Sequence, residues 1–459
     1  MYKSTRGQDC LGGLEAIMQG IARDGGLFVP SSFPQLSLEQ LELFPREESY
    51  KSIATWIIKA YLPEVSLQRI EEAVKKATAL FVNPAITPIR EVDDTIFLEC
   101  FYGPTKAFKD IALSLLPHFY KLGEEITHEK RIVLVATSGD TGSATLAGFS
   151  QLPDAKVIIF YPHRGISPYQ EHQMLSYESN NMHSIAIEGN FDDCQALVKK
   201  LFREYPLLTS ANSINIGRLL PQITYYFVAY KELLDRKLIE KNELINFSVP
   251  TGNFGNILAG YIAKRMGCPI HRLLCASNQN HVLTDFFQTG TYNRNRPFYI
   301  TNSPSMDILV SSNLERLLFW IGGEQEVKRC MKSLEETGSY TIQEQDKAAY
   351  SFFYAAYASI EETTETIEGF YKRTHYIMDP HTAVAKKVMD DYKKETHDAH
   401  KTVVISTASY EKFMDTIRPI VPHLPPDPDY AFICKEKRHV WSLDEVLKQF
   451  DSLVKEMIR

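Results

Sequence analysis

The sequence predicts an α/β protein in which largely parallel sheets carry helices on both faces, preceded by a mainly helical N-terminal region. From about residue 95, short runs rich in β-branched and apolar residues alternate with helix-like segments. This alternation is typical of parallel strands joined by helices. The runs are continuously apolar, as strands buried on both faces require.

The first 85 residues indicate a separate helical domain. Four segments place apolar residues at helical spacing, and Pro84 and Pro88 then interrupt the pattern. We therefore predict an N-terminal helical domain over residues 1–85. Its expected helices span residues 14–24, 37–44, 49–62 and 67–81.

Residues 86–425 are expected to form the catalytic region, followed by a C-terminal tail and helix over 426–459. Further helices are predicted at 313–322, 346–360 and 442–458, and the Pro-rich segment 422–430 is a connection. Several strands end in Gly-, Ser- or Thr-rich turns, where open α/β sheets place their ligands. The expected strands are 95–100, 131–137, 156–162, 184–189, 245–250, 271–277 and 402–408.

Composition limits the possible partners. The chain of 459 residues has a net charge of −7, which argues against a nucleic-acid or anionic-membrane surface. An anionic substrate would therefore need a local basic pocket. The seven scattered cysteines form no metal-ligand spacing, and neither a signal peptide nor a membrane-spanning apolar run is present. Cytoplasmic localisation is expected.

The first stretch with chemical potential is FYGPTKAFKD (101–110), which precedes an apolar-periodic run. A helix that begins near Asp110 would leave Lys109 at its N-terminal edge. There the helix dipole and neighbouring aromatic rings disfavour an ammonium group, and a lysine with a lowered pKa is a good Schiff-base nucleophile. Lys106 competes for this role, and a lysine at a helix start is most often a solvated surface residue.

The second stretch is ATSGDTGSA (136–144), between an expected strand and a helical run. Its small residues allow backbone N–H groups to converge on an anion at a helix N-terminus, together with the hydroxyls of Thr137, Ser138 and Thr141. An ordinary strand-to-helix turn is the alternative, although such a turn rarely needs two glycines and three hydroxyls.

The third stretch, VPTGNFGNILAG (249–260), repeats the order strand, glycine-rich loop, helix. Gly252 and Gly255 permit close approach of a ligand, and the loop N–H groups with the amides of Asn253 and Asn256 suit a phosphate monoester. The fingerprints of dinucleotide and nucleoside-triphosphate sites are absent. The phosphate would therefore belong to a smaller molecule.

Together with further runs, these stretches resemble the threonine synthase family. The motifs follow that family's order and extend from the first residues to beyond residue 410. TSGDTG and the Gly-Asn loop also occur separately across the wider fold-type II pyridoxal-phosphate enzymes. The matching runs are GPTKAFKD (103–110), TSGDTG (137–142), FDDCQALVK (191–199), SANSINIGR (210–218), PTGNFGN (250–256), SMDI (305–308) and DPHTA (379–383).

The resemblance implies a fold-type II architecture similar to the tryptophan synthase β subunit, with two open parallel-sheet domains. A small subdomain at about 125–215 is expected to be mobile and to close over the ligand. The implied cofactor is pyridoxal 5′-phosphate, which Lys109 would hold as a Schiff base before shuttling protons. Asp140 would lie beside the cofactor's 3′-oxygen and Thr407 opposite its pyridine nitrogen. The cofactor phosphate would lie on Gly252, Asn253, Phe254, Gly255 and Asn256.

The implied reaction is γ-elimination of phosphate from O-phospho-L-homoserine followed by β-addition of water, which yields L-threonine. Thr137, Ser138 and Thr141, with Asp140, are expected to bind the carboxylate end of the substrate. The alternative for Arg218 is a surface arginine on the following helix. The residues expected to hold the γ-phosphate are Ser167, Asn212, Asn215 and Arg218.

The sequence departs from the family pattern at Lys106, where an apolar residue is frequent, and at ASYEKF (408–413), where the family has A-H-P-A-K-F. These departures affect the expected shape of the pocket. A related phospho-lyase or dehydratase acting on O-phosphothreonine, O-phosphoserine, serine or threonine is therefore the alternative function, and a non-catalytic binding protein is another. No metal is expected, and the resemblance allows a monomer or a homodimer.

Overall fold

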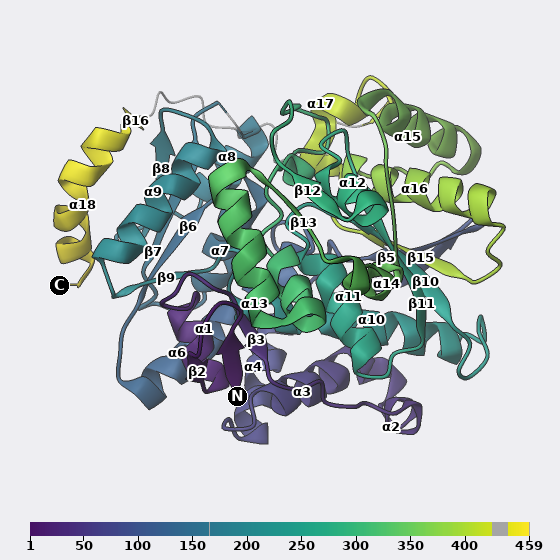
Figure 1. Ribbon diagram of the computed structural model, residues 1–459, viewed down its shortest axis with the longest axis horizontal. Coiled ribbons are helices and arrows are strands. Elements are labelled where there is room, and N and C mark those ends of the chain that lie inside the picture. Colours follow the sequence, from purple (N-terminus) through teal and green to yellow (C-terminus); the bar gives the residue numbers. More distant parts are fainter. Residues whose placement is uncertain (165, 425–438, 459) are drawn as a thin grey trace.

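The computed structural model describes residues 1–164, 166–424 and 439–458. An N-terminal domain lies below two sheet domains, a smaller one on the left and a larger one on the right (Figure 1). No helix within the described ranges combines the length and apolar character needed to cross a membrane. The arrangement confirms the predicted class, with parallel sheets and a separate N-terminal domain.

The N-terminal domain contains all four predicted helices. Ser37 caps α2 by accepting a hydrogen bond from Gln40 N, and the buried face of α4 repeats at helical spacing. A three-stranded antiparallel sheet was not predicted, because its strands are too short to show a pattern. The elements are β1 (Tyr2–Ser4), β2 (Cys10–Leu11), α1 (Gly13–Gln19), β3 (Phe28–Pro30), α2 (Leu38–Glu42), η1 (Arg46–Glu48), α3 (Ser49–Tyr61) and α4 (Leu67–Thr78).

The large domain is built on a six-stranded sheet with the order β14-β11-β10-β15-β5-β4, parallel except for β4. Phe247 and Leu273 pack under α10 (Ile216–Asp235) and α11 (Gly255–Arg265). Leu274 and Val404 pack under α15 (Ile360–Thr374) and α16 (Pro380–Thr396). Both faces are therefore buried, as the continuously apolar strands predicted. The strands are β4 (Ile89–Val92), β5 (Thr95–Glu99), β10 (Ile245–Pro250), β11 (Ile270–Ser277), β14 (Phe353–Tyr357) and β15 (Thr402–Ser406).

The small domain is a five-stranded parallel sheet with the order β16-β8-β7-β6-β9. Val135 and Ile159 pack on the face covered by α7, and Leu134 and Ile158 on the face covered by α9. All seven predicted strands are present in the two domains. The elements are β6 (Ile132–Ala136), α7 (Asp140–Phe149), β7 (Val157–Pro162), α8 (Pro168–Leu175), β8 (Met182–Ile187), α9 (Phe191–Glu204) and β9 (Leu208–Ser210).

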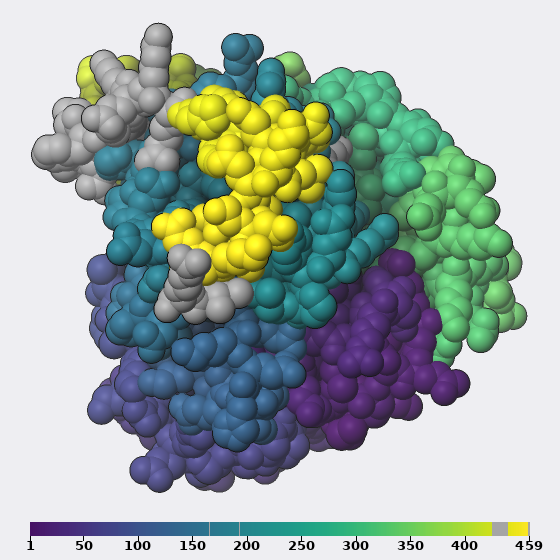
Figure 2. Space-filling model, turned by 90° about the vertical axis from the view of Figure 1, so that its left-hand side faces the viewer, coloured from purple at the N-terminus to yellow at the C-terminus, as the bar shows by residue number. Residues whose placement is uncertain are grey.

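The end of the chain returns to the small domain. β16 (Val440–Trp441) pairs with β8, and α18 (Leu443–Ile458) buries Phe450 and Val454 against the sheet. Figure 2 shows α18 lying across the outer surface of this domain. The predicted terminal helix is confirmed, but the structure places it within the small domain and not on a separate tail. The expected connection at 422–430 lies largely outside the described residues.

The predicted helix at 346–360 is wrong over its second half. A short helix, α14 (Lys347–Tyr350), is followed by strand β14, which pairs in parallel with β11. Phe353 and Ala355 are buried on one face of this edge strand. The alanine-rich sequence favours a helix locally, and pairing with β11 overrides that preference.

The remaining elements connect the domains and cover their edges. The predicted helix at 313–322 is confirmed as part of α13 (Leu314–Thr337), which changes direction at Gly323, where φ is 79°. The others are α5 (Lys109–Leu113), α6 (Leu116–Thr127), α12 (Val282–Thr289), β12 (Thr291–Asn293), η2 (Pro304–Met306), β13 (Ser339–Thr341), η3 (Glu344–Asp346), η4 (Tyr410–Phe413) and α17 (Met414–Ile417).

Replacing Phe450 with alanine is expected to destabilise the small domain by about 3 to 5 kcal/mol, because a buried ring is lost and a cavity remains. The ring centroid lies 5.1 Å from that of Tyr205 and 6.3 Å from that of Phe160. Urea unfolding measured by circular dichroism gives the difference. The control Lys448→Ala, at an exposed site on the same helix, should change stability by less than about 0.5 kcal/mol. Equal stability of the two variants would contradict this packing.

Candidate active site

A cavity lies where the carboxyl ends of β5, β6, β10 and β15 approach one another. Its outline takes in about 1000 Å³ of space, part of which is open solvent. The segments that follow these four strands contribute most of the predicted site residues. Those that line the cavity are Lys109, Thr137, Ser138, Asp140, Thr141, Asn212, Arg218, Gly252, Asn253, Phe254, Gly255, Asn256 and Thr407.

The glycine-rich loop before α11 lines the cavity. Ser311 Oγ donates to Gly252 O at 2.7 Å, and Asn313 Nδ2 donates to Asn253 O at 2.9 Å. These two bonds fix the loop carbonyls. The first N–H groups of α11 have no carbonyl partner within the helix. A Cβ on Gly252 would lie 2.8 Å from Ser305 O. The loop is therefore tightly packed and suited to an anion.

Phe254 shapes the glycine-rich loop through its backbone conformation. It adopts a left-handed φ of 64° at the start of α11. Its buried ring lies 5.8 Å from Phe287 and 5.7 Å from Phe353, measured between centroids. Aromatic packing thus fixes an unusual backbone conformation, which shapes the loop around its ligand.

Asn256 presents an amide donor without a partner. Tyr225 and Tyr226 direct their hydroxyls to Asn256 Oδ1, at 2.5 Å and 2.9 Å. Burial raises the pKa of both tyrosines well above its usual value, so both remain donors. The carboxamide oxygen is therefore occupied, and the buried Nδ2 has no hydrogen-bond partner. A phosphate oxygen would satisfy it.

Lys109 begins α5, as predicted, and only 12% of its side chain is exposed. Its Nζ lies 3.3 Å from Ser305 Oγ and 3.6 Å from Asp140 Oδ2. Burial lowers the pKa of Lys109; Asp140 opposes this shift, and the nearby Arg218 adds to it. Lys106 instead pairs with Glu411 at 2.7 Å and does not line the cavity. The geometry thus favours Lys109 over its competitor as the reactive amine.

Asp140 is a buried carboxylate with several donors. Its Oδ1 accepts from Gln170 Nε2 at 2.9 Å and lies 3.1 Å from Lys412 Nζ, while Oδ2 accepts from Ser305 Oγ at 3.1 Å. Burial alone would raise the pKa of Asp140, but Lys412 and Lys109 reverse the shift and hold it well below its usual value. Asp140 is therefore ionised.

Three residues that line the cavity or contact Asp140 were not predicted as site residues: Ser305, His381 and Lys412. Ser305 and His381 belong to matched motifs, which offered a signal, and His381 Nε2 accepts from Ser305 N at 3.1 Å. Lys412 follows β15 and reaches Asp140 only through the folded arrangement. No pattern in the sequence indicates that contact.

The turn before α7 has a mixed role. Thr137 Oγ1 accepts from Gly139 N at 2.9 Å and from Gly142 N at 3.0 Å, which stabilises the turn. Ser138 and Thr141 line the cavity beside the N-terminus of α7. Both readings of this stretch, a structural turn and an anion site, are compatible with the geometry.

Arg218 is a buried cation facing the cavity and not a surface residue. It is 3% exposed, and burial lowers its pKa to about 10. Nη1 donates to Ala211 O at 2.7 Å, whereas Nε is buried without a hydrogen-bond partner. Within the described ranges, no carboxylate forms an ion pair with it. Such a guanidinium calls for an anionic ligand.

Ser167 and Asn215 are not brought into the cavity. Ser167 caps α8 by accepting from Gln170 N at 3.2 Å. Asn215 is buried at the start of α10 and donates to Ser210 O at 2.7 Å and Ile17 O at 2.9 Å. Asn212 lines the cavity, although its Nδ2 donates to Ala136 O at 2.7 Å. Helix capping thus accounts for two of the four residues expected at the γ-phosphate.

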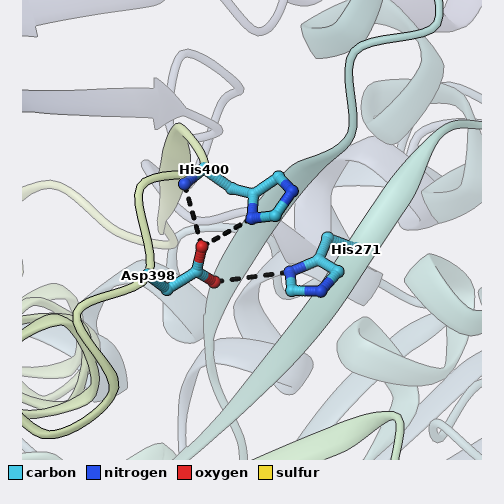
Figure 3. Close-up of side chains that lie close together, drawn as sticks. All are labelled: His271, Asp398 and His400. Carbon is cyan, nitrogen blue, oxygen red and sulfur yellow. Dashed lines mark hydrogen bonds and ion pairs between the residues drawn. The ribbon is translucent and has the colours of Figure 1, made fainter.

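Among the described residues, one group of metal-ligand side chains lies elsewhere, at the amino ends of β11 and β15 (Figure 3). His271 Nδ1 and His400 Nδ1 lie 3.3 Å and 2.5 Å from oxygens of Asp398. Asn246 and Tyr392 also donate to this carboxylate. The two imidazole rings stack, with centroids 4.0 Å apart, and both Nδ1 atoms face the same carboxylate. We interpret the group as a hydrogen-bonded cluster that joins strands.

Comparison with known proteins places this site in a family. A family described as "Threonine synthase N terminus" matches residues 1–78, and "Pyridoxal-phosphate dependent enzyme" matches residues 78–408. Threonine synthase of Schizosaccharomyces pombe is 37% identical over 453 residues, covering 90% of this chain and 87% of that protein. The chain belongs to the threonine synthase family. Human threonine synthase-like 1 is 39% identical, and the match covers 88% of this chain and 57% of that protein.

Solved structures agree with the assignment to the threonine synthase family. A crystal structure of PLP-bound threonine synthase from Brucella melitensis superposes with a TM-score of 0.90 at 36% identity, covering 100% of this chain and 99% of that one. Threonine synthase from yeast gives a TM-score of 0.88 at 31% identity, covering 99% of each chain. The predicted fold-type II architecture and the cofactor, pyridoxal phosphate, are thereby confirmed.

The cavity suits this cofactor on physical grounds. The unpartnered Asn256 Nδ2 and the N–H groups of the Gly252–Gly255 loop would hold its phosphate. Lys109 could supply the amine that its aldehyde requires, and Thr407 lies just beyond the carboxyl end of β15 on the cavity wall. A neutral hydroxyl facing the pyridine nitrogen would leave that nitrogen largely unprotonated.

Asn256→Ala is expected to weaken cofactor binding about 10- to 100-fold, since a hydrogen bond to a charged phosphate contributes about 1.5 to 3 kcal/mol. Fluorescence titration of cofactor-free protein with pyridoxal phosphate measures the dissociation constant. Gln449→Ala, which removes an exposed amide on α18, should bind as tightly as the unmodified chain. Unchanged affinity in Asn256→Ala would contradict the role of this amide.

Proposed function

We propose that this chain synthesises L-threonine from O-phospho-L-homoserine, releasing inorganic phosphate. The observation that carries the proposal is a second anion site beside the cofactor loop. Arg218 is buried, faces the cavity and has no carboxylate partner among the described residues. A cofactor with one phosphate accounts for the glycine-rich loop alone. A substrate with its own phosphate accounts for the arginine.

Lys109 is the proposed catalytic residue. When bound, pyridoxal phosphate supplies an aldehyde that captures amines and a ring that stabilises negative charge at substrate carbons. The lowered pKa of Lys109 makes its amine available both as a nucleophile and as a base. Its Nζ can therefore take a proton from the bound amino acid and return it at a neighbouring carbon.

The substrate is proposed to lie between two groups of anion ligands. Arg218 Nε and Asn212 would bind the γ-phosphate, with the arginine neutralising the leaving group. Ser138, Thr141 and the N-terminus of α7 would bind the α-carboxylate. These two ends orient the carbon chain past Lys109 Nζ, so that elimination and the addition of water occur at defined carbons.

Exclusion of water is the proposed task of the small domain. The cavity lies between the two sheets, and residues from both line it. Closure of the subdomain predicted at about 125–215 would limit premature hydrolysis of reactive intermediates. Asp140 and Arg218 are already buried in this arrangement, so a modest movement suffices.

A substrate panel distinguishes this reaction from its alternatives. Purified holoenzyme given O-phosphohomoserine should release phosphate and threonine in equal amounts. O-phosphothreonine, O-phosphoserine, serine and threonine should react at least about 100-fold more slowly in kcat/KM, because they place the phosphate or hydroxyl at another distance from Lys109. Formation of 2-oxobutanoate or pyruvate as the main product would instead establish the lyase or dehydratase alternative.

Arg218→Gln should lower kcat/KM for O-phosphohomoserine by about 100-fold or more, since a buried charge contact to phosphate is lost. Steady-state phosphate release measures this change, and the variant should still bind the cofactor. An unchanged kcat/KM would remove Arg218 from the phosphate site. Lys106→Gln, a change outside the cavity, serves as the control and should retain activity.

A further inference from the structure

Lys412 is a fully buried cation beside the reactive amine. Its side chain is 0% exposed and comes from η4, immediately after β15. Nζ donates to Thr105 O at 2.6 Å and to Gln173 Oε1 at 3.1 Å, and it lies 3.1 Å from Asp140 Oδ1. Lys412 therefore joins the segment before Lys109 to α7 and α8 of the small domain.

The two lysines share one carboxylate unequally. Lys412 lies 3.1 Å from Asp140 Oδ1, whereas Lys109 lies 3.6 Å from Oδ2. If both amines were protonated, two positive charges would share the Asp140 carboxylate, with Arg218 close by. Charging Lys109 as well is therefore unfavourable in a site of low polarity.

We propose that Lys412 is a positioning residue that balances the charge of Asp140 and thereby keeps Lys109 available as a neutral amine. Asp140 stays ionised and oriented because Lys412, Gln170 and Ser305 all contact it. Without the second cation, Asp140 would attract a proton onto Lys109. The inference rests on the cofactor role of Lys109 and not on the identity of the substrate.

Other titratable groups face this cluster and set the usable pH range. Asp110 is buried and accepts from Thr105 Oγ1 at 2.7 Å, and burial raises its pKa to about 6. His381 lines the same cavity, and Lys106 and Glu411 form a pair beside η4. Because the pKa of Asp110 rises only to about 6, measurements above about pH 7.5 report mainly on Lys109.

The test compares the pH midpoint of the amine at position 109 in three full-length variants. Lys412→Gln removes the charge and keeps a hydrogen-bond donor. Lys412→Arg keeps the charge, and the double variant Lys412→Gln with Asp140→Asn removes both charges. Two readouts are used: the visible absorbance of the lysine-bound cofactor against pH, and the rate at which trinitrobenzenesulfonate labels Lys109 in cofactor-free protein, located by peptide mapping.

Lys412→Gln should raise both midpoints by about one pH unit or more, because the carboxylate is left uncompensated. Lys412→Arg and the double variant should return them to within about 0.3 unit of the unmodified chain. Lys106→Gln, the matched lysine outside the cavity, should leave them unchanged. Should Lys412→Gln not fold, Asp140→Asn alone gives the complementary result, a downward shift.

If Lys412→Gln lowers thermal stability and leaves the pH midpoints unchanged, Lys412 has only a structural role. That result would overturn the inference. An unmoved midpoint in Asp140→Asn would overturn it as well. Failure of the proposed function is distinguishable. The substrate panel could identify another substrate while the pH midpoints at position 109 still shift as stated. The labelling of Lys109 needs neither substrate nor cofactor.

Discussion

The active site depends on one electrostatic constraint: a buried carboxylate, Asp140, must remain ionised next to an amine that must be able to lose its proton. Two lysine amines, Lys412 and Lys109, lie beside the carboxylate, and burial lowers the pKa of Lys109. In water the charges of these groups would be screened, and their pKa values would be close to the usual ones. Enclosure between two domains lowers the pKa of a lysine at a helix start.

The topology of the two sheets provides that enclosure. Parallel strands direct their carboxyl ends to one edge, and the segments after β5, β6, β10 and β15 meet there. The loop before α11 and the turn before α7 thus present two helix N-termini to one cavity. The C-terminal β16 and α18 complete the small domain on its far side. Residues far from the chemistry therefore support the geometry of the anion sites.

Local patterns predicted much of this arrangement and failed where non-local contacts decide. Seven buried strands and Lys109 at a helix start follow from apolar runs and neighbouring residues. The local sequence at β14 favours a helix, and only pairing with β11 makes it a strand. The resemblance places Ser167 at the γ-phosphate, but this residue caps a helix. Lys412 contacts Asp140 although the two residues lie 272 positions apart in the sequence. No local pattern indicates such contacts.

We propose that the side chain of Lys109 carries the cofactor. Borohydride reduction of the holoenzyme fixes the cofactor to its amine, and proteolysis with mass spectrometry then locates it. A pyridoxyl group is expected on the peptide that contains Lys109 and none on Lys106 or Lys412. A pyridoxyl group on another lysine, or on no lysine, would contradict it.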